Sequence, residues 1–245
     1  MSMKYAASTA VIILAVLALA VGGSSAEAGP PHRTYRVTLS NLTDGQPFSP
    51  GAAATHRPSF HAFEVGELAH PAIEAIAEDG NHMPAIQALT DLAEDGVVSD
   101  WYEIGRPITR AGTVVGDFTD SITFEIDARP GDRLSLATML ICTNDGFTGL
   151  DGVKLPAQGS VTYHSMGYDA GTEENTEESE HIVDPCSGLG PVPLAGDPND
   201  PNGGVASDPL EPISHHPGIS GDGDLSASMH DWMNPVAEIE IERID

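Results

Sequence analysis

The stretch Leu134-Ser-Leu-Ala-Thr-Met-Leu-Ile-Cys142-Thr-Asn-Asp-Gly146 decides how the rest of this chain is interpreted. Its first part is apolar or small, partly β-branched and bounded by polar turns, which predicts a buried β-strand. The Asn-Asp-Gly that follows predicts a turn, because asparagine and aspartate tolerate left-handed backbone and glycine adopts positive φ freely. We therefore expect a strand over 134–142 and a turn over 143–152.

A second acidic turn, Tyr168-Asp-Ala-Gly-Thr-Glu173, follows a candidate strand at 160–165. If this strand lies beside the strand at 134–142, acidic residues of both turns converge at one end of a sheet. The candidates are Asp145, Asp151, Asp169 and Glu173. Such a cluster of hard oxygen ligands suits Ca²⁺. The alternative is that Asp145 and Asp169 only hydrogen-bond their own turns.

Several separated motifs, in order, resemble the spondin domain, the N-terminal module of F-spondin and mindin that also occurs as a stand-alone secreted protein in microbes. The motifs are Tyr35-Arg-Val-Thr-Leu-Ser-Asn-Leu-Thr-Asp-Gly-Gln-Pro-Phe-Ser-Pro50, Phe63-Glu-Val-Gly66, Ser135-Leu-Ala-Thr-Met-Leu-Ile141, Asn144-Asp-Gly-Phe-Thr-Gly-Leu-Asp151 and Tyr168–Glu173. The resemblance spans about 34–244. It implies an antiparallel β-sandwich with a calcium site near its loops, and an adhesive or matrix role in the animal members.

The resemblance also ranks the ligands. The calcium site of spondin domains draws on acidic residues in these same two turns, which favours Asp145 and Asp169. Glu173 stands where animal members commonly have aspartate, and the longer side chain changes its reach. Asp151 is the weaker candidate.

The remaining pattern predicts a mainly β fold, an antiparallel β-sandwich with two short helices packed on it. Alternating segments at 35–40, 121–127 and 236–244 predict strands with one dry face, and 45–50 predicts a turn. Two segments, 71–80 and 84–96, each begin with proline, end with glycine and contain apolar residues at helical spacing. With 245 residues and 40% hydrophobic content, one domain over 34–245 is sufficient.

The first residues indicate export. Lys4 precedes an apolar run, and small residues up to Ala28 offer cleavage sites, so residues 1–26 are predicted to be a signal peptide. A retained membrane anchor is the alternative. The run is short for a membrane span, so we expect a secreted protein, extracellular or periplasmic, with no span after cleavage.

The charge is strongly acidic. Ten basic residues oppose 37 acidic ones, for a formal net charge of −27. A surface of this kind repels nucleic acid and anionic membranes, so a nucleic-acid partner is excluded. Divalent cations are the obvious local counter-ions for the acidic second half.

Cys142 and Cys186 are the only two cysteines. An even count in an exported protein favours a disulfide, whereas two separate buried thiols are the alternative. Between them and the last strand, residues 187–228 are rich in Pro, Gly, Asp and Ser, and predict a long acidic loop or disordered excursion.

The catalytic motifs sought are absent: there is no His-Glu-x-x-His, Gly-x-Ser-x-Gly or phosphate-binding Gly-x-x-x-x-Gly-Lys sequence. We therefore expect a secreted calcium-binding module, without enzymatic activity, that binds an extracellular protein or glycan. One alternative is a carbohydrate-active hydrolase that uses paired carboxylates, for which any acidic protein offers candidates. The other is a structural protein of the cell envelope.

Overall fold

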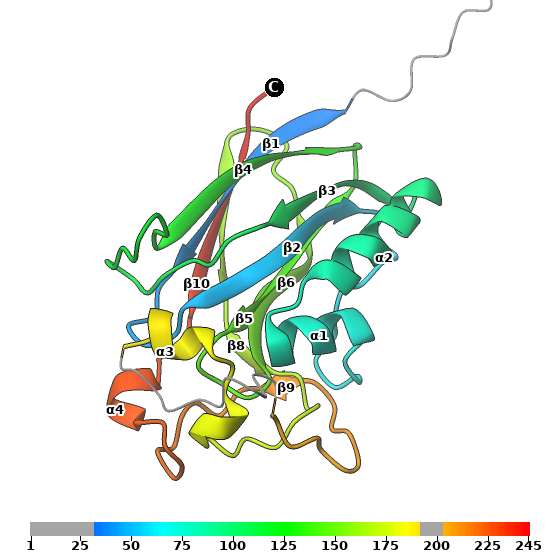
Figure 1. Ribbon diagram of the computed structural model, residues 1–245. Helices are drawn as coiled ribbons and strands as arrows, with labels where there is room; N and C mark the ends of the chain where they lie inside the picture. Colours follow the sequence, from blue (N-terminus) through cyan, green and yellow to red (C-terminus); the bar gives the residue numbers. More distant parts are fainter. Residues whose placement is uncertain (1–31, 192–202) are drawn as a thin grey trace, which may run out of the picture.

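The computed structural model describes residues 32–191 and 203–245 (Figure 1). Two antiparallel sheets pack face to face, and two helices cover the outer face of one sheet. The expected β-sandwich with two short helices packed on it is therefore confirmed. The predicted signal peptide, residues 1–26, lies outside the described residues.

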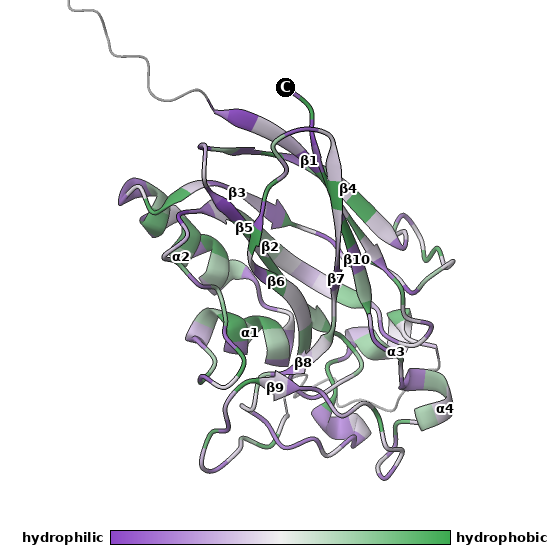
Figure 2. Ribbon diagram, turned by 180° about the vertical axis from the view of Figure 1, so that it is seen from behind, coloured by the Kyte–Doolittle hydropathy of each residue, from purple (hydrophilic) through white to green (hydrophobic). Residues whose placement is uncertain are grey.

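The smaller sheet has four strands in the order β4-β1-β10-β7. Their bounds are β1 (Arg33–Asn41), β4 (Ser121–Ala128), β7 (Ser160–Ser165) and β10 (Ala237–Arg243). Val37 faces Ile241 across the β1–β10 ladder and both are fully buried. On the opposite, wet face Arg36 pairs with Glu125 and Glu242 at 3.2 Å. Figure 2 shows the resulting change between hydrophobic and hydrophilic colours along these strands.

The larger sheet has six strands in the order β3-β2-β5-β6-β8-β9. Their bounds are β2 (Phe48–His56), β3 (Val98–Ile104), β5 (Arg133–Leu140), β6 (Gly146–Lys154), β8 (Gly167–Asp169) and β9 (Ser214–His215). Both faces of β5 are buried. Leu134 and Leu136 belong to the core between the sheets, whereas Ala137 and Met139 belong to a second core beneath the helices.

Helices α1 (Pro71–Asp79) and α2 (Met83–Glu94) form where the proline and glycine signals predict them. Gly80 ends α1 with φ of 63°, a left-handed conformation that glycine adopts without steric cost. The apolar faces of the two helices pack on the six-stranded sheet through Ile73, Ile76, Ile86 and Leu89.

The described part of the 187–228 connection has little regular structure but is not detached from the fold. Ile213, Ile219 and Leu225 are buried in the core beneath the helices, together with Ile182 and Val183. Three short helices lie at this end of the molecule: η1 (Ser179–His181), α3 (Pro185–Leu189) and α4 (Ala227–His230). Segments 172–191 and 203–230 thus close one end of the sandwich (Figure 1).

Three local expectations were wrong. The residues at 48–50 do not form a turn, because β2 already begins at Phe48, and the turn at 143–152 is shorter because β6 begins at Gly146. In addition, the strands at 134–142 and 160–165 are not neighbours: they correspond to β5 and β7, which belong to different sheets. After β7 the chain crosses to the six-stranded sheet and pairs there as β8 with β6.

Within residues 32–191 and 203–245, the structure contains no helix of the length and apolarity that a membrane crossing requires.

Candidate functional site

Two acidic turns meet where β6 begins and β8 ends. Gly146 pairs with Asp169 in the β6–β8 ladder, so Asp145 and Asp169 lie side by side at the end of that ladder. The backbone N–H of Ala170 donates to the carbonyl oxygen of Asp145 at 3.1 Å. Asp145 and Asp169 therefore converge as predicted, although β8 rather than β7 brings Asp169 to this end of the sheet.

Asp145 is completely buried. Its Oδ2 accepts hydrogen bonds from the backbone amides of Thr172 at 2.7 Å and Glu173 at 3.0 Å, and from the Thr172 hydroxyl at 3.2 Å. Its Oδ1 has no hydrogen-bond partner among the described residues. Burial of a carboxylate oxygen without a donor or cation is costly, so Oδ1 of Asp145 would be stabilised by a bound donor or cation.

Four further carboxylates act electrostatically on Asp145 or on one another. Burial, and then the charge of Asp169, raise the pKa of Asp145 to about 6. Burial and three nearby carboxylates raise the pKa of Glu173 to about 8. Those three are Glu78, Asp145 and Asp79. We refer to Glu78, Asp79, Asp145, Asp169 and Glu173 as the acidic cluster.

No positive charge neutralises the acidic cluster within the described part of the chain. None of the ion pairs there includes one of its five carboxylates. The described structure therefore places several acids within electrostatic range of one another, one of them with an orphaned oxygen, and pairs none of them with a cationic side chain.

Glu78 and Asp79 were missed by the sequence analysis. They end helix α1, which has no basic residue in its last turn. Acidic residues are unfavourable there because the helix dipole places partial negative charge at the C-terminus. Two acidic residues at a helix C-terminus were the one sequence feature that could have indicated a functional role. Only the packing of α1 on β5 and β6 shows which turn Glu78 and Asp79 approach.

Asp169 and Glu173 are held by their own turns and by a distant segment. Oδ1 of Asp169 accepts from the Gly171 amide at 2.7 Å, and Oδ2 accepts from Nδ2 of Asn175 at 2.6 Å. Glu173 forms an isolated bridge with Ala206, and its carboxylate lies so close to Gly204 that a Cβ there would collide with it. The alternative of hydrogen bonds within the residue's own turn therefore holds for Asp169, whereas Asp145 accepts from the second turn and its Oδ1 stays unmatched.

Asp151 does not join the cluster. It lies on β6 five residues beyond Gly146, which is roughly 17 Å along an extended strand. Its carboxylate instead contacts Nδ1 of His61 at 2.6 Å, the amide of Ala62 at 2.6 Å and the Ser135 hydroxyl at 3.2 Å. The inclusion of Asp151 among the ligands is corrected, because the predicted turn at 143–152 is mostly strand.

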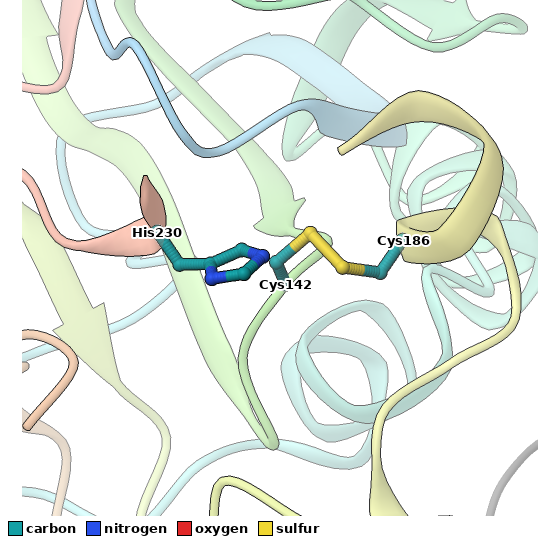
Figure 3. Close-up of side chains that lie close together, drawn as sticks. All are labelled: Cys142, Cys186 and His230. Carbon is teal, nitrogen blue, oxygen red and sulfur yellow. A yellow bond between two sulfur atoms is a disulfide. The ribbon is translucent and has the colours of Figure 1, made fainter. Parts of the chain in front are cut away.

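The disulfide between Cys142 and Cys186 is present, with the two Cα atoms 5.1 Å apart. It ties the segment that carries Glu173 to the end of β5. His230 lies beside it (Figure 3), and its Nδ1 accepts a hydrogen bond from the Ser226 amide at 3.0 Å. The three side chains are close enough for metal ligation, but both sulfurs are already bonded to each other, so the group does not offer the thiolates that such a site requires.

Glu177 fixes the segment beyond the cluster. Its carboxylate is buried and accepts from the amides of Ser220 at 2.6 Å and Gly221 at 2.7 Å. Asn144 in the first turn accepts from the Glu177 amide at 3.2 Å. Glu177 also has φ of 56°, a conformation that is costly for a residue with a Cβ. This carboxylate therefore holds the 219–225 segment in place.

The sequence model of one family, described as Spondin_N, matches residues 40–184. This match covers more than half of the 245 residues. The chain belongs to the Spondin_N family. The matched region of this spondin domain includes Asp145, Asp169 and Glu173 and both helices, and ends before Cys186. No curated protein matches the chain in sequence.

Proposed function

We propose that this spondin domain is a secreted calcium-binding module that binds an extracellular protein or glycan. The calcium part of the proposal depends on one observation: the fully buried Asp145 carries an oxygen with no partner, inside a cluster of four further carboxylates. A divalent cation would supply the missing partner and offset the repulsion among these groups.

The donor set favours calcium over softer metals. Carboxylate oxygens of Asp145, Asp169 and Glu173, with Glu78 from the adjacent helix, are hard ligands, and Ca²⁺ accepts six to eight such oxygens in flexible geometry. The cluster contains neither histidine nor free thiolate, the ligands that zinc and copper prefer. Water and backbone carbonyl oxygens of the two turns would complete the coordination.

Export is supported by the disulfide and by the signal-like first residues. Disulfides persist in oxidising compartments and are rare where glutathione keeps thiols reduced. Cys142 and Cys186 form the disulfide while no free cysteine remains among the described residues. A secreted domain of net charge −27 would also meet calcium at extracellular concentrations.

A binding role is favoured over a hydrolase. Paired catalytic carboxylates need a cleft that admits a polysaccharide. The two cavities lined by residues 33–155 include none of the acidic cluster, and the cluster lies at the end of the sandwich under the 203–211 segment. A screen against polysaccharides tests the alternative, and turnover that is lost in Asp145→Asn and Glu173→Gln variants would contradict the binding role.

Thermal unfolding with and without calcium tests the central claim. After exhaustive removal of metal, calcium at about 100 times its dissociation constant is expected to raise the free energy of unfolding by roughly 2.7 kcal/mol, because it binds only the folded state. Magnesium at the same concentration is the control for general screening of the −27 charge. A melting temperature that does not respond to calcium or chelator would rule out the site.

The adhesive part needs its own experiment. The purified domain, immobilised with calcium or with chelator, is exposed to extracellular proteins and polysaccharides of the source organism. Retention of a defined protein or glycan in calcium, and its release by chelator, is the expected result. Equal retention in both conditions would separate ligand binding from the acidic cluster.

A further inference from the structure

A cavity of about 370 Å³ lies between helices α1 and α2 and the outer face of the six-stranded sheet. Its walls come from β2, β5, the two helices and the loop that precedes α1. Eight of its 18 lining residues are alanine, and the short alanine side chains leave the space between the helices and the sheet unfilled. None of the acidic cluster lines it, so the cavity is separate from the proposed calcium site.

The cavity has the properties of a small-molecule pocket rather than of ordinary packing. Side chains that line an empty void lose dispersion contacts, and protein interiors rarely contain voids much larger than water. Ligand pockets span about 300–1,000 Å³ and combine apolar walls with a few polar groups. The deep wall here is apolar, with Ala54, Ile73, Leu89 and Ala137 among its residues.

Three polar residues of the cavity lining are exposed to solvent. The exposed residues His61, His70 and Asp91 belong to its lining. His70 is already engaged, because its Nδ1 accepts from the Ala72 amide at the start of α1. A molecule that enters the cavity can leave its polar end near the exposed His61.

His61 is held in place by a chain of hydrogen bonds. Nδ1 of His61 donates a hydrogen bond to the Asp151 carboxylate at 2.6 Å. The same carboxylate accepts from the Ala62 amide at 2.6 Å and from the Ser135 hydroxyl at 3.2 Å, which fix its position. The bond to a carboxylate places a proton on Nδ1. Nε2 of His61 has no hydrogen-bond partner among the described residues and is available to a ligand.

The charges around the cavity limit the ligand. Asp91 lines the cavity and Asp151 is bonded to His61, in a protein of net charge −27, so an anionic head group is repelled. A hydroxyl group suits Nε2 in both protonation states of His61, because it can donate to the neutral ring and accept from the protonated ring.

We propose that this cavity binds a small neutral molecule with an apolar body and a terminal hydroxyl, with the body between the helices and the sheet and the hydroxyl on His61. Asp151 is then a positioning residue for this second site. Each methylene buried is expected to improve affinity about fourfold, so hexanol, with two more methylenes, should bind roughly fifteenfold more tightly than butanol.

Methyl NMR of the full mature chain, titrated with hexanol, tests the proposal directly. The expected result is saturable shifts confined to cavity methyl groups such as those of Ala54, Ile73 and Leu89. Hexanoate is expected not to bind over the same concentration range. The absence of saturable shifts would overturn the site, and equal affinity for hexanoate would overturn the ligand class.

A filled cavity provides the matched comparison. Ala72→Leu combined with Ala88→Leu places larger side chains into the cavity from both helices and should lower hexanol affinity at least tenfold. The control combines Ala75→Leu with Gln87→Leu, on the same two helices but outside the lining. If the filled protein binds hexanol as well as the control does, the observed binding is elsewhere and the proposal fails.

His61→Phe tests the polar anchor, because phenylalanine keeps the ring but removes its nitrogens. Hexanol affinity should fall about two- to tenfold, as expected for one hydrogen bond, while hexane affinity does not fall. Unchanged hexanol affinity would remove His61 from the site. All these variants should retain the calcium response, which keeps the two proposals distinguishable.

Discussion

The backbone amide of Ala170 donates a 3.1 Å hydrogen bond to the carbonyl oxygen of Asp145. This bond continues the β6–β8 ladder by one step and joins the two acidic turns through backbone atoms alone. The carboxylates of Asp145 and Asp169 are therefore brought together by the sheet, whether or not a cation is present. A site assembled in this way requires little rearrangement to bind its ion, which favours affinity.

Asp145→Asn is expected to remove most of the stabilisation by calcium. The variant keeps an oxygen for the Thr172 and Glu173 amides but replaces the orphaned Oδ1 with an amide group that cannot ligate a cation. Without calcium it should be at least as stable as the parent, because one negative charge has left the cluster. Urea unfolding with calcium and with chelator measures both effects.

Asp151→Asn is the matched control for that experiment, since Asp151 contacts His61 and lies outside the acidic cluster. It should keep the full calcium response. The assignment of ligands would be wrong if Asp151→Asn lost the response while Asp145→Asn retained it.

Glu78→Gln tests the contribution of helix α1. Its carboxylate acts on both Asp145 and Glu173, and burial raises the pKa of Glu78 above its ordinary value. We expect a calcium affinity several-fold weaker than that of the parent, a smaller loss than for Asp145→Asn because Glu78 is half-exposed. Glu94→Gln, in the last turn of α2 and exposed, is the control. Calorimetric titration gives the affinities, and equal values for the two variants would exclude Glu78 from the site.

Much of the sandwich follows from the sequence because its strands obey a two-residue period. Segments around Val37, Phe124 and Ile239 bury one face and expose the other, and alternation makes that visible. Strand β2 was not predicted because it reads Phe-Ser-Pro-Gly-Ala-Ala-Ala-Thr-His, in which Thr55 is the single β-branched residue of the kind that strands favour. It is buried on both faces, between the other sheet and the helices, and small residues suit that position. At Gly51 a Cβ would collide with the carbonyl of Ala137 on β5.

Only some residues of the candidate site could be predicted from the sequence. Asp145 and Asp169 could be proposed because each follows a strand within a turn. Asp151 was wrong because Gly146 starts a strand that carries Asp151 away from the turn. Glu78 comes from a helix 67 residues before Asp145, and no local pattern indicates that α1 ends beside that turn. Contacts of this kind are set by the packing of α1 on β5 and β6.

Glu177→Gln should destabilise the protein by about 2–4 kcal/mol. The side-chain NH2 group of glutamine would replace one carboxylate oxygen and would face a backbone N–H that donates to this oxygen in the parent protein. Both carboxylate oxygens are used, on the Ser220 and Gly221 amides. Protease cleavage within 219–228 should increase in parallel, since this carboxylate holds that segment. The exposed Glu174→Gln, three residues away, should change the free energy of unfolding by no more than about 0.5 kcal/mol. Equal stabilities of the two variants would show that the segment is held by other contacts.

The last prediction concerns acid stability and His56, which is fully buried. Burial lowers the pKa of His56 below 6.5, against the opposing effects of the Arg57 carbonyl and of Asp151 and Asp132, while His61 adds a further lowering. The unfolded chain therefore binds the proton more tightly than the folded chain. Above about pH 6.5 both states are neutral at this residue and it has no effect on stability.

As the pH falls from 6.5 towards the folded-state pKa, unfolding takes up a proton, so the free energy of unfolding decreases by at most about 1.4 kcal/mol per pH unit. Burial also lowers the pKa of His230. Part of the pH dependence of the free energy of unfolding should therefore remain in a His56→Gln variant. Saturating calcium keeps the acidic cluster charged in these measurements, which removes its opposite contribution. We expect His56→Gln to have a shallower slope than the parent between pH 5 and 6.5, whereas the exposed His164→Gln keeps it. Parallel slopes for His56→Gln and the parent would show that His56 remains neutral in both states or is protonated in both, contrary to its buried position.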